Sequence, residues 1–177
     1  MYINIGEKAI YVVIADKNRK IIYMEKLDKL DKSILHLLQI DSSLNTKQIA
    51  DEIGLSVTPT YERIKRLERT GVIEKYVALL NKEKIGKNLV VYCSVSLQVH
   101  SKPLLKKFEL AISKMDEVME CYHTAGTFDY LLKVVSVDMF HYQDFITNKL
   151  AATENIGHVQ SSFVMTEVKH KTEYKIG

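Results

Sequence analysis

Apolar residues recur at helical spacing in three consecutive segments that begin at residue 27. In the first segment they lie three or four residues apart, which places them on one face of a helix: Leu27, Leu30, Ile34 and Leu37 or Leu38. The stretch "DSSLN" breaks this pattern. In the second segment Asn45 predicts an N-cap, and Gln48 three residues later completes the spacing of a capping box. Gly54 predicts a left-handed C-cap for this short helix.

The third segment, "GLSVTPTYERIKRLERTG" at 54–71, predicts a helix with Ser56 as N-cap, Pro59 in its first turn and Gly71 after its end. At about 100° per residue one set of side chains faces the core, with Tyr61 at its edge: Val57, Thr60, Ile64 and Leu67. The opposite face is small and polar at its start and cationic further along, with Arg63 on the flank: Thr58, Pro59, Glu62, Lys65, Arg66 and Arg69.

After Gly71 the pattern becomes β-like. We predict a short linking strand at 72–80 and a polar turn at 81–86. Apolar residues then alternate along a strand at 89–99, all on one face: Leu89, Val91, Cys93, Val95, Leu97 and Val99. The remaining elements are, in order, a helix at 101–115 with Ser101 as N-cap, strands at 118–124 and 130–136, a helix at 138–150 with Asp138 as N-cap, and a strand at 158–168.

This order predicts an α+β protein with two domains. An N-terminal helix-turn-helix domain, winged-helix-like, covers 25–75, and a linking strand and hinge cover 76–86. The β-α-β-β-α-β order of 87–177 predicts a ferredoxin-like domain whose two helices cover one face of the sheet. A half-covered apolar sheet is an interaction surface, so we expect a partner subunit on its other face.

The first 24 residues stand apart from this pattern. They read as a hairpin of two short strands around a polar turn at Asp16–Arg19. A lone hairpin is marginally stable in water, so it packs on another element or is disordered. Because Met24 is followed at once by the first helical pattern, residues 1–23 are interpreted as an extension, a start assigned too far upstream, or a cloning remnant.

Composition limits the function classes. The 177-residue chain has a net charge of +3, which is too mild to identify a nucleic-acid binder by itself. Cys93 and Cys121 lie far apart in apolar stretches, so we predict two buried thiols in a reducing cytosol, with no disulfide or metal spacing. No apolar run reaches about 18 residues and no secretory signal precedes the first helix, so neither a membrane partner nor secretion is expected.

Two helices joined by the tight turn at 54–56 predict a helix-turn-helix, whose second helix enters the major groove of double-stranded DNA. Thr58, Pro59 and Glu62 would lie near base edges, and Glu62 can accept from cytosine N4. Lys65, Arg66 and Arg69 would neutralise phosphates. The predicted DNA-binding set is Ser56, Thr58, Pro59, Glu62, Arg63, Lys65, Arg66 and Arg69. The alternative is a solvated basic face on an ordinary three-helix bundle.

Motifs for catalysis are missing from the sequence. The histidines show no HxxxH or HExxH spacing: His36, His100, His123, His141, His158 and His170. Gly86-Lys87 lacks the flanking residues of a P-loop, and no GxSxG or GxGxxG occurs. His123 near Asp129 suggests a catalytic pair, but a structural role is favoured. We therefore predict no enzyme, metal or cofactor; a ligand-sensing or assembly module of ferredoxin-like fold without DNA binding is the alternative.

Three stretches, "LDKLDKSILHLLQ", "GLSVTPTYERIKRLERTGVIEKYVALLN" and "AGTFDYLLKV", together resemble the Lrp/AsnC (feast/famine) family of prokaryotic transcription regulators. The resemblance covers residues 27 to about 173. It implies a cytoplasmic, nucleoid-associated protein that binds DNA through its helix-turn-helix. It also implies an effector-binding and oligomerisation domain at 87–177, which forms homodimers and often octamers (tetramers of dimers).

In this family a small effector, usually an amino acid, binds between subunits near the loop that joins the second and third strands of the ferredoxin-like domain. Carried over by position, the effector site is His123, Ala125, Gly126, Thr127, Asp129, Ser161 and Ser162. Many members have an acidic residue where this chain has Thr127, and Gly-Arg where it has Ser42 and Ser43. The alternative for the loop is a tight hairpin turn in which Asp129 caps the turn and Gly126 supplies positive φ.

Overall fold

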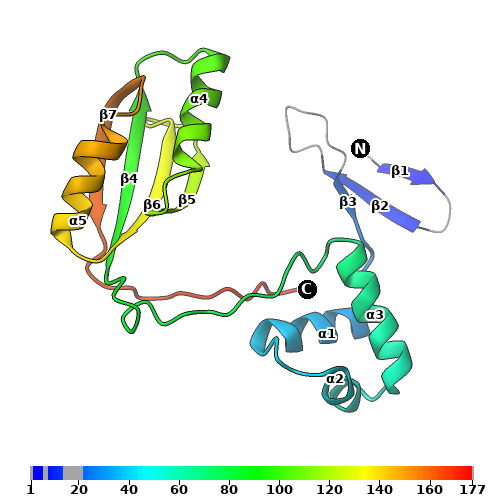
Figure 1. Ribbon diagram of the computed structural model, residues 1–177. Helices are drawn as coiled ribbons and strands as arrows, with labels where there is room; N and C mark the ends of the chain where they lie inside the picture. The colour runs from blue at the N-terminus through cyan, green and yellow to red at the C-terminus, as the bar shows by residue number, and fades with distance from the viewer. Residues whose placement is uncertain (1, 6–7, 14–21, 177) are drawn as a thin grey trace. The chain divides into compact units, whose positions relative to one another are not determined.

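The structure is a computed structural model that describes residues 2–5, 8–13 and 22–176. The chain divides into two compact units (Figure 1). The N-terminal unit runs to Ala78 and also includes the segment that begins at Lys171, whereas the C-terminal unit is Leu79–His170. The polypeptide therefore passes out of the N-terminal unit, forms the whole C-terminal unit and returns.

Three helices build the N-terminal unit: α1 (Lys29–Ile40), α2 (Thr46–Ile53) and α3 (Val57–Arg69). The predicted capping box is confirmed, because the Asn45 side chain accepts from the Gln48 N–H and the Gln48 side chain accepts from the Asn45 N–H. Gly54 ends α2 with a φ of 70°, as predicted. A second capping box at α1 joins Asp28 and Asp31, and the sequence analysis missed it because Asp occupies the usual Glu/Gln position.

The core of the N-terminal unit is made by one face of each helix: Ile34, Leu35, Ile49, Ile64 and Leu67. Thr60 is also buried and donates its hydroxyl hydrogen to the Ser56 carbonyl over 3.0 Å. Val57, which was predicted on this face, is 46% exposed. It is the first residue of α3, whereas the members of the buried cluster that come from this helix, Ile64 and Leu67, lie in its later turns.

The linking strand predicted at 72–80 is not formed; this part of the described chain has no ladder partner. Its apolar side chains are instead in contact with solvent, with Val77, Leu79 and Leu80 exposed by 57%, 69% and 70%. A strand needs a neighbouring strand to satisfy its backbone groups, and local alternation cannot supply one. The predicted turn at 81–86 is present and ends at Gly86, whose φ is 70°.

The C-terminal unit contains a four-stranded antiparallel sheet in the order β5-β6-β4-β7. Its elements follow one another as β4 (Leu89–Leu97), α4 (Lys102–Ile112), β5 (Val118–His123), β6 (Tyr130–Ser136), α5 (Met139–Asp144), η1 (Phe145–Leu150) and β7 (Ile156–Phe163). The helical segment η1 continues α5 directly. This is the predicted ferredoxin-like order, with the last strand starting and ending earlier than expected.

One face of this sheet packs on its helices. Alternate residues of β4, namely Val91, Cys93, Val95 and Leu97, lie in a single buried cluster with Phe108 and Ile112 of α4 and with Tyr142, Phe145 and Leu150 of α5 and η1. Val99 lies beyond the end of the strand and is 51% exposed, contrary to the prediction. Cys121 is also exposed, not buried as predicted, because it lies on the edge strand β5.

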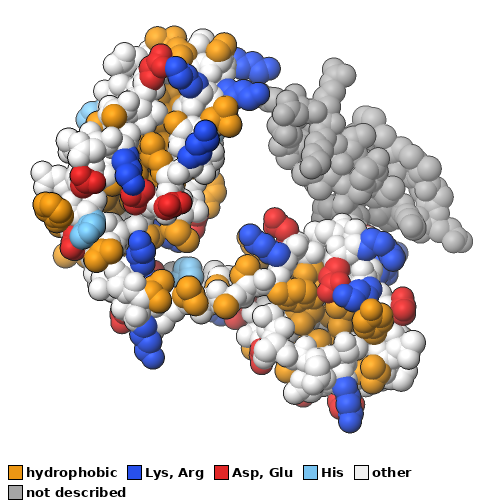
Figure 2. Space-filling view, viewed as in Figure 1, with side chains coloured by type: hydrophobic (Ala, Val, Ile, Leu, Met, Phe, Trp, Pro, Cys, Tyr) orange, Lys and Arg blue, Asp and Glu red, His pale blue; other side chains and the backbone are white. Residues whose placement is uncertain are grey.

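The opposite face of the sheet and the linking segment leave apolar side chains uncovered in this chain. Tyr92, Met119 and Tyr122 are exposed by 36%, 64% and 52%. Figure 2 shows hydrophobic side chains on the surface of both units, interspersed with charged ones. None of the helices in the described ranges is long and apolar enough to cross a bilayer.

Residues near the N-terminus form a three-stranded antiparallel sheet of β1 (Tyr2–Ile5), β2 (Lys8–Val13) and β3 (Ile22–Met24). The pairing of β2 with β3 confirms the predicted pair of strands, and β1 was not predicted. The predicted turn at Asp16–Arg19 lies outside the described residues.

The segment after residue 170 packs on α1, although the sequence analysis assigned it to the ferredoxin-like domain. The Tyr174 N–H donates to Oε1 of Gln39 over 2.7 Å, and Nε2 of Gln39 donates to the Tyr174 carbonyl over 3.2 Å. Ile176 adds a partly buried side chain to the core of the three helices. The end of the chain is therefore a structural part of the N-terminal unit.

Candidate nucleic-acid interface and ligand-binding loop

The outward face of α3 presents small and polar side chains to solvent in the N-terminal half of the helix. Ser56 precedes the helix in an extended conformation, which confirms it as the N-cap, but its side chain makes no capping hydrogen bond. Thr58, Pro59 and Glu62 are all exposed. This end of the helix follows the three-residue turn after α2. The three side chains expected near base edges are thus free of the protein core.

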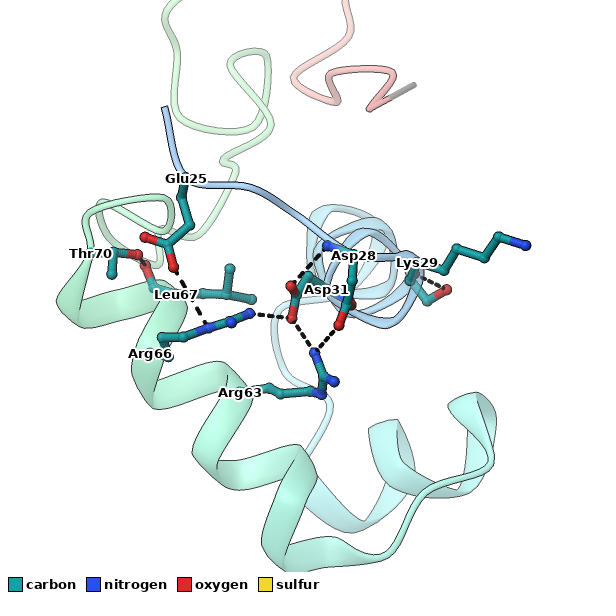
Figure 3. A network of polar contacts seen from close by, with 9 residues as sticks. Glu25, Asp28, Lys29, Asp31, Arg63, Arg66, Leu67 and Thr70 are labelled. Carbon is teal, nitrogen blue, oxygen red and sulfur yellow. Dashed lines mark hydrogen bonds and ion pairs between the residues drawn. The ribbon is translucent and has the colours of Figure 1, made fainter. Parts of the chain in front are cut away.

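A buried carboxylate on α1 holds the middle of α3 (Figure 3). Only 1% of the Asp31 side chain is exposed. Its Oδ1 lies 2.7 Å from Nη1 of Arg63 and 2.5 Å from Nη2 of Arg66. The same Arg63 nitrogen lies 2.7 Å from Oδ2 of Asp28. Two arginines of the predicted DNA-binding set, Arg63 and Arg66, therefore form ion pairs at the N-terminus of α1.

This network corrects the predicted face of Arg66. The helical wheel placed its side chain on the outward face, but the structure turns it toward Asp31, and its Nε and Nη2 atoms are buried. Nε also lies 3.8 Å from Oε1 of Glu25. A long arginine side chain can reach across a flank to a buried acid, and a wheel drawn from Cα positions does not include that reach.

The electrostatics of the network follow from its hydrogen bonds. The Asp31 backbone N–H donates to Oδ1 of Asp28 over 2.8 Å, and this bond, with the nearby Arg63 guanidinium, lowers the pKa of Asp28. Hydrogen bonds to Asp28 and Asp31 raise the pKa of Arg63. Both carboxylates also lie at the positive end of the α1 dipole, which stabilises negative charge there. The network therefore favours the ionised forms of Asp28 and Arg63.

The remaining basic residues of α3 have different surroundings. Nζ of Lys65 lies 2.7 Å from Oε2 of Glu68 and 5.6 Å from the centroid of the Tyr61 ring. The Tyr76 hydroxyl donates to Oε1 of Glu68 over 3.1 Å, and its burial together with that carboxylate raises the pKa of Tyr76 to about 12. Arg69 is exposed, and no ion-pair partner for it occurs among the described residues.

The turn after α1 has its own hydrogen bonds. Ser43 donates its backbone N–H and its hydroxyl to Oδ1 of Asp41 over 2.9 and 2.6 Å. These bonds lower the pKa of Asp41. Ser42 and Ser43 are both exposed. A serine in place of arginine at this turn therefore stabilises the turn itself and adds no positive charge.

The loop between β5 and β6 is a closed hairpin. The Thr124 N–H donates to the Asp129 carbonyl over 2.8 Å, and the Thr124 hydroxyl donates to the Phe128 carbonyl over 2.9 Å. Its tip, Ala125 to Thr127, is exposed. A Cβ added at Gly126 would meet no atom of the described chain within 4 Å. The tip therefore has open space beside its backbone.

Asp129 anchors this loop to the end of β4. Its Oδ2 accepts the Leu97 N–H over 2.7 Å, and its Oδ1 lies 2.9 Å from Nε2 of His100. The Leu97 N–H, followed by the His100 side chain, lowers the pKa of Asp129. Both carboxylate oxygens are thus engaged within the chain. These contacts favour the turn-anchoring alternative for Asp129, and the histidine that contacts its carboxylate is His100.

The other predicted effector residues are separated within one chain. The His123 ring stacks on Tyr130, with centroids 4.8 Å apart. Ser161 lies opposite Cys93 on β7 and accepts a hydrogen bond from the Tyr142 hydroxyl over 2.6 Å, which places it on the helix-covered face. Ser162 is the next residue of the strand and points to the other face. The structure therefore brings His123 to Asp129 together in one hairpin and leaves the two serines on a different strand.

Among the described residues, no three His, Cys, Asp or Glu side chains lie close enough together to bind a metal ion. The polar features that the structure does assemble are the exposed start of α3 and the exposed tip of the β5–β6 loop. Each lies within one of the two units.

Two family models match the chain at these features. Residues 27–68 match the AsnC-type helix-turn-helix domain, which contains α1, α2 and nearly all of α3. Residues 90–174 match the Lrp/AsnC ligand binding domain. This range contains the β5–β6 loop and, apart from Leu89 at the start of β4, the whole four-stranded sheet.

Relatives agree with this assignment. The DNA-binding transcriptional activator DecR of Escherichia coli K12 is 36% identical over 150 residues, covering 85% of this chain and 99% of DecR. The leucine-responsive regulatory protein of the same strain is 35% identical over 150 residues, covering 85% of this chain and 92% of the relative.

Solved structures give the same result. A transcriptional regulator from Neisseria meningitidis, in complex with L-Met, superposes with a TM-score of 0.82 and is 33% identical over 85% of this chain and 97% of its own. An AsnC family regulator from Agrobacterium tumefaciens has a TM-score of 0.80 and is 40% identical, covering 84% of this chain and 97% of its own. This chain therefore belongs to the Lrp/AsnC family of transcriptional regulators.

Proposed function

We propose that this protein is a sequence-specific regulator of transcription that binds double-stranded DNA through α3 and responds to a small effector, an amino acid. The observation that carries the proposal is the exposed N-terminal half of α3, with Thr58, Pro59 and Glu62 uncovered in a helix-turn-helix. In that motif the N-terminal residues of the second helix contact base edges in the major groove. Such a regulator acts in the cytoplasm, on the nucleoid.

The cations of α3 divide between binding and folding in this proposal. Arg69 is exposed and free to neutralise a phosphate, and Lys65 lies at the surface beside Glu68. Arg63 and Arg66 contribute positive potential, but their guanidinium groups are already paired with Asp31. By fixing the orientation of α3, these arginines hold Thr58, Pro59 and Glu62 in place for contact with the bases. They do not themselves distinguish one base from another.

DNA binding is tested by selecting duplexes from a random library with the full chain and measuring their affinity between about 50 and 200 mM salt. The proposal expects enriched sequences and an affinity that falls steeply as salt rises, because phosphate contacts release counterions. Failure to enrich any duplex, or an affinity independent of salt, would leave the ligand-sensing module as the function. Glu62→Gln is expected to change the enriched sequence, whereas Arg69→Ala should weaken all duplexes alike.

The effector is proposed to bind at the tip of the β5–β6 loop, between subunits. Support comes from the exposed tip residues and from the open space beside Gly126. Loop N–H groups can hold a carboxylate. Thr127 offers a hydroxyl but no charge toward the ammonium group of an amino acid. Ser161 and Ser162 complete the proposed site only if another subunit contributes them, because within one chain they lie on β7, apart from the β5–β6 hairpin that holds His123.

A thermal-shift screen of the twenty amino acids tests the effector site. A ligand that binds only the folded state raises the melting temperature. Thr127→Arg is expected to abolish the shift by filling the tip, while Thr127→Ser retains it. Asp129→Ala is a poor probe here because it also removes the anchor of the loop. Equal shifts in the Thr127→Arg and wild-type proteins would place the ligand elsewhere.

We further propose a homodimer made through the open sheet face, with assembly to octamers. The uncovered Tyr92, Met119 and Tyr122 and the exposed linking segment supply apolar surface for such contacts. Dimers place two copies of α3 about one helical turn of DNA apart, or a multiple of it, and higher assembly adds avidity. Sedimentation of the wild type and of Met119→Lys tests this, since a charge at the interface should shift the population toward monomers.

A further inference from the structure

One flank of α3 carries two large apolar side chains in contact with solvent. Val57 is 46% exposed and Tyr61 is 47% exposed. With Lys65 they follow one another at intervals of four residues, so they form a single ridge along the helix surface. We call Val57, Tyr61 and Lys65 the exposed ridge. In Figure 2 orange side chains reach the surface of the N-terminal unit beside charged ones, as expected for such a mixed surface.

The exposed ridge lies away from the contacts that hold α3 in place. Arg63 and Arg66 occupy the opposite flank, where they meet Asp31 of α1. Between the two flanks lies the outward face with the exposed Thr58, Glu62 and Arg69. The ridge is therefore continuous with the surface that the proposed function directs into the major groove, and it begins at the first residue of the helix.

The Tyr61 ring is oriented although it is not buried. Nζ of Lys65 lies 5.6 Å from its centroid, within the range of a cation–π contact. The same nitrogen is held by Oε2 of Glu68 at 2.7 Å. A ring fixed in this way loses little further conformational freedom when it is covered by a ligand. On the outward face the polar Thr58 lies one turn before Tyr61, and the cation Arg69 lies two turns after it, one turn beyond Lys65.

In the major groove the apolar group that distinguishes one base pair from the others is the C5-methyl of thymine. We infer that Val57 and Tyr61 contact thymine methyl groups and so give the protein a preference for A·T pairs at the positions that the start of α3 covers. This inference rests on the proposed function, since it requires α3 to enter the groove. Charge complementarity selects DNA as the occupant, because the exposed Arg69, which has no ion-pair partner among the described residues, places positive charge on the outward face next to the ridge.

The experiment compares thymine with uracil, which lacks only the methyl group. Duplexes enriched by the full chain are prepared with deoxythymidine and again with deoxyuridine at every thymine. We expect the wild type to bind the uracil duplex about fourfold more weakly for each buried methyl lost. Tyr61→Ala and Val57→Ala should each bind the thymine duplex more weakly and show a smaller ratio between the two duplexes, and the double variant should show a ratio near one.

Two controls separate methyl contacts from other effects. Tyr61→Phe keeps the ring and should keep the wild-type ratio. Arg69→Ala should weaken both duplexes by the same factor, because a phosphate contact does not sense the methyl group. Val57 and Tyr61 are exposed, so melting temperatures within a few degrees of the wild type are expected for all variants.

Four outcomes of these binding measurements would contradict the thymine contacts of Val57 and Tyr61. Equal affinity of the wild type for thymine and uracil duplexes overturns the inference while leaving DNA binding intact. A wild-type ratio that survives in the double variant also overturns it, because the methyl groups are then read by other residues. Failure of the wild type to bind any duplex at low salt refutes the proposed function itself, and the inference with it. A ridge that binds another protein would leave both duplex affinities unchanged by Tyr61→Ala.

Discussion

Nη2 of Arg66 lies 2.5 Å from Oδ1 of Asp31, an acid whose side chain is only 1% exposed. This contact joins the middle of α3 to the first turn of α1 across a sequence separation of 35 residues. Oδ1 of Asp31 also accepts a hydrogen bond from Nη1 of Arg63 over 2.7 Å, and Oδ2 of Asp31 accepts one from the Asp28 N–H over 3.1 Å. One buried carboxylate therefore caps a helix and sets the orientation of the proposed recognition helix against it.

Replacing Asp31 with Ala is expected to destabilise the N-terminal unit strongly. Two guanidinium groups would lose their shared acceptor, and the buried nitrogens of Arg66 would have no counter-charge except the more distant Glu25. Breaking a buried ion pair from one side costs about 3–5 kcal/mol. Urea unfolding, followed by the helical circular dichroism signal, measures this loss.

Asp28→Asn provides the matched control for that variant. Asn is as good an N-cap as Asp, and the Asp28 side chain is 52% exposed, so its ion pair with Arg63 is screened by solvent. We expect a change in unfolding free energy below about 1 kcal/mol. Equal losses in Asp28→Asn and Asp31→Ala would show that burial of the carboxylate is not what makes the network important.

The salt dependence of DNA binding should separate the two kinds of arginine on α3. Arg69→Ala is expected to reduce the magnitude of the log–log slope by about 0.9, the value for one lost phosphate contact. Arg66→Ala should reduce the slope less and the unfolding free energy more, because Arg66 is paired with Asp31. Matching slope changes in the two variants would mean that Arg66 leaves Asp31 when DNA binds.

The contacts of Asp129 predict an acid-sensitive C-terminal unit. Asp129→Ala leaves the N–H of the buried Leu97 without its acceptor and should cost about 1–3 kcal/mol at pH 7. Because the folded-state pKa of Asp129 is lowered, its ionised form stabilises the fold above about pH 4, and this contribution is lost as the pH falls further. Urea unfolding at pH 7 and pH 3 should show the cost of Asp129→Asn shrinking at low pH; a cost that stays constant contradicts this.

Removing the segment after His170 should destabilise the three-helix unit even though that segment is remote in sequence. The deletion loses two hydrogen bonds between Tyr174 and Gln39 and the partly buried Ile176. We expect a loss of about 2 kcal/mol in the unfolding free energy. Hydrogen exchange of the α1 amides measures it locally.

A chain that ends after Lys175 is the control for this deletion. It keeps both hydrogen bonds of Tyr174 and loses only the Ile176 contact, so an intermediate effect is expected. Unchanged exchange of α1 in the longer deletion would show that the terminal segment contributes no stability to the helices.

Periodicity and local caps determined most of the fold. The start of α2, its left-handed end at Gly54 and the alternation of β4 depend on neighbours a few residues apart, so the sequence reveals them directly. The strand predicted from apolar alternation at 72–80 is not formed. A strand exists only when another strand pairs with it, and the described chain offers none there.

The sequence by itself determined that α3 is a helix with an exposed, partly cationic surface in a helix-turn-helix protein of this family. Only the tertiary structure decided what each cation does, because the partner of Arg63 and Arg66 is an acid more than thirty residues away that becomes buried when α1 packs on α3. Likewise, only packing left Val57 and Tyr61 in contact with solvent and committed Asp129 to Leu97. Burial and long-range pairing are properties of the assembled chain, whereas local patterns specify only the elements.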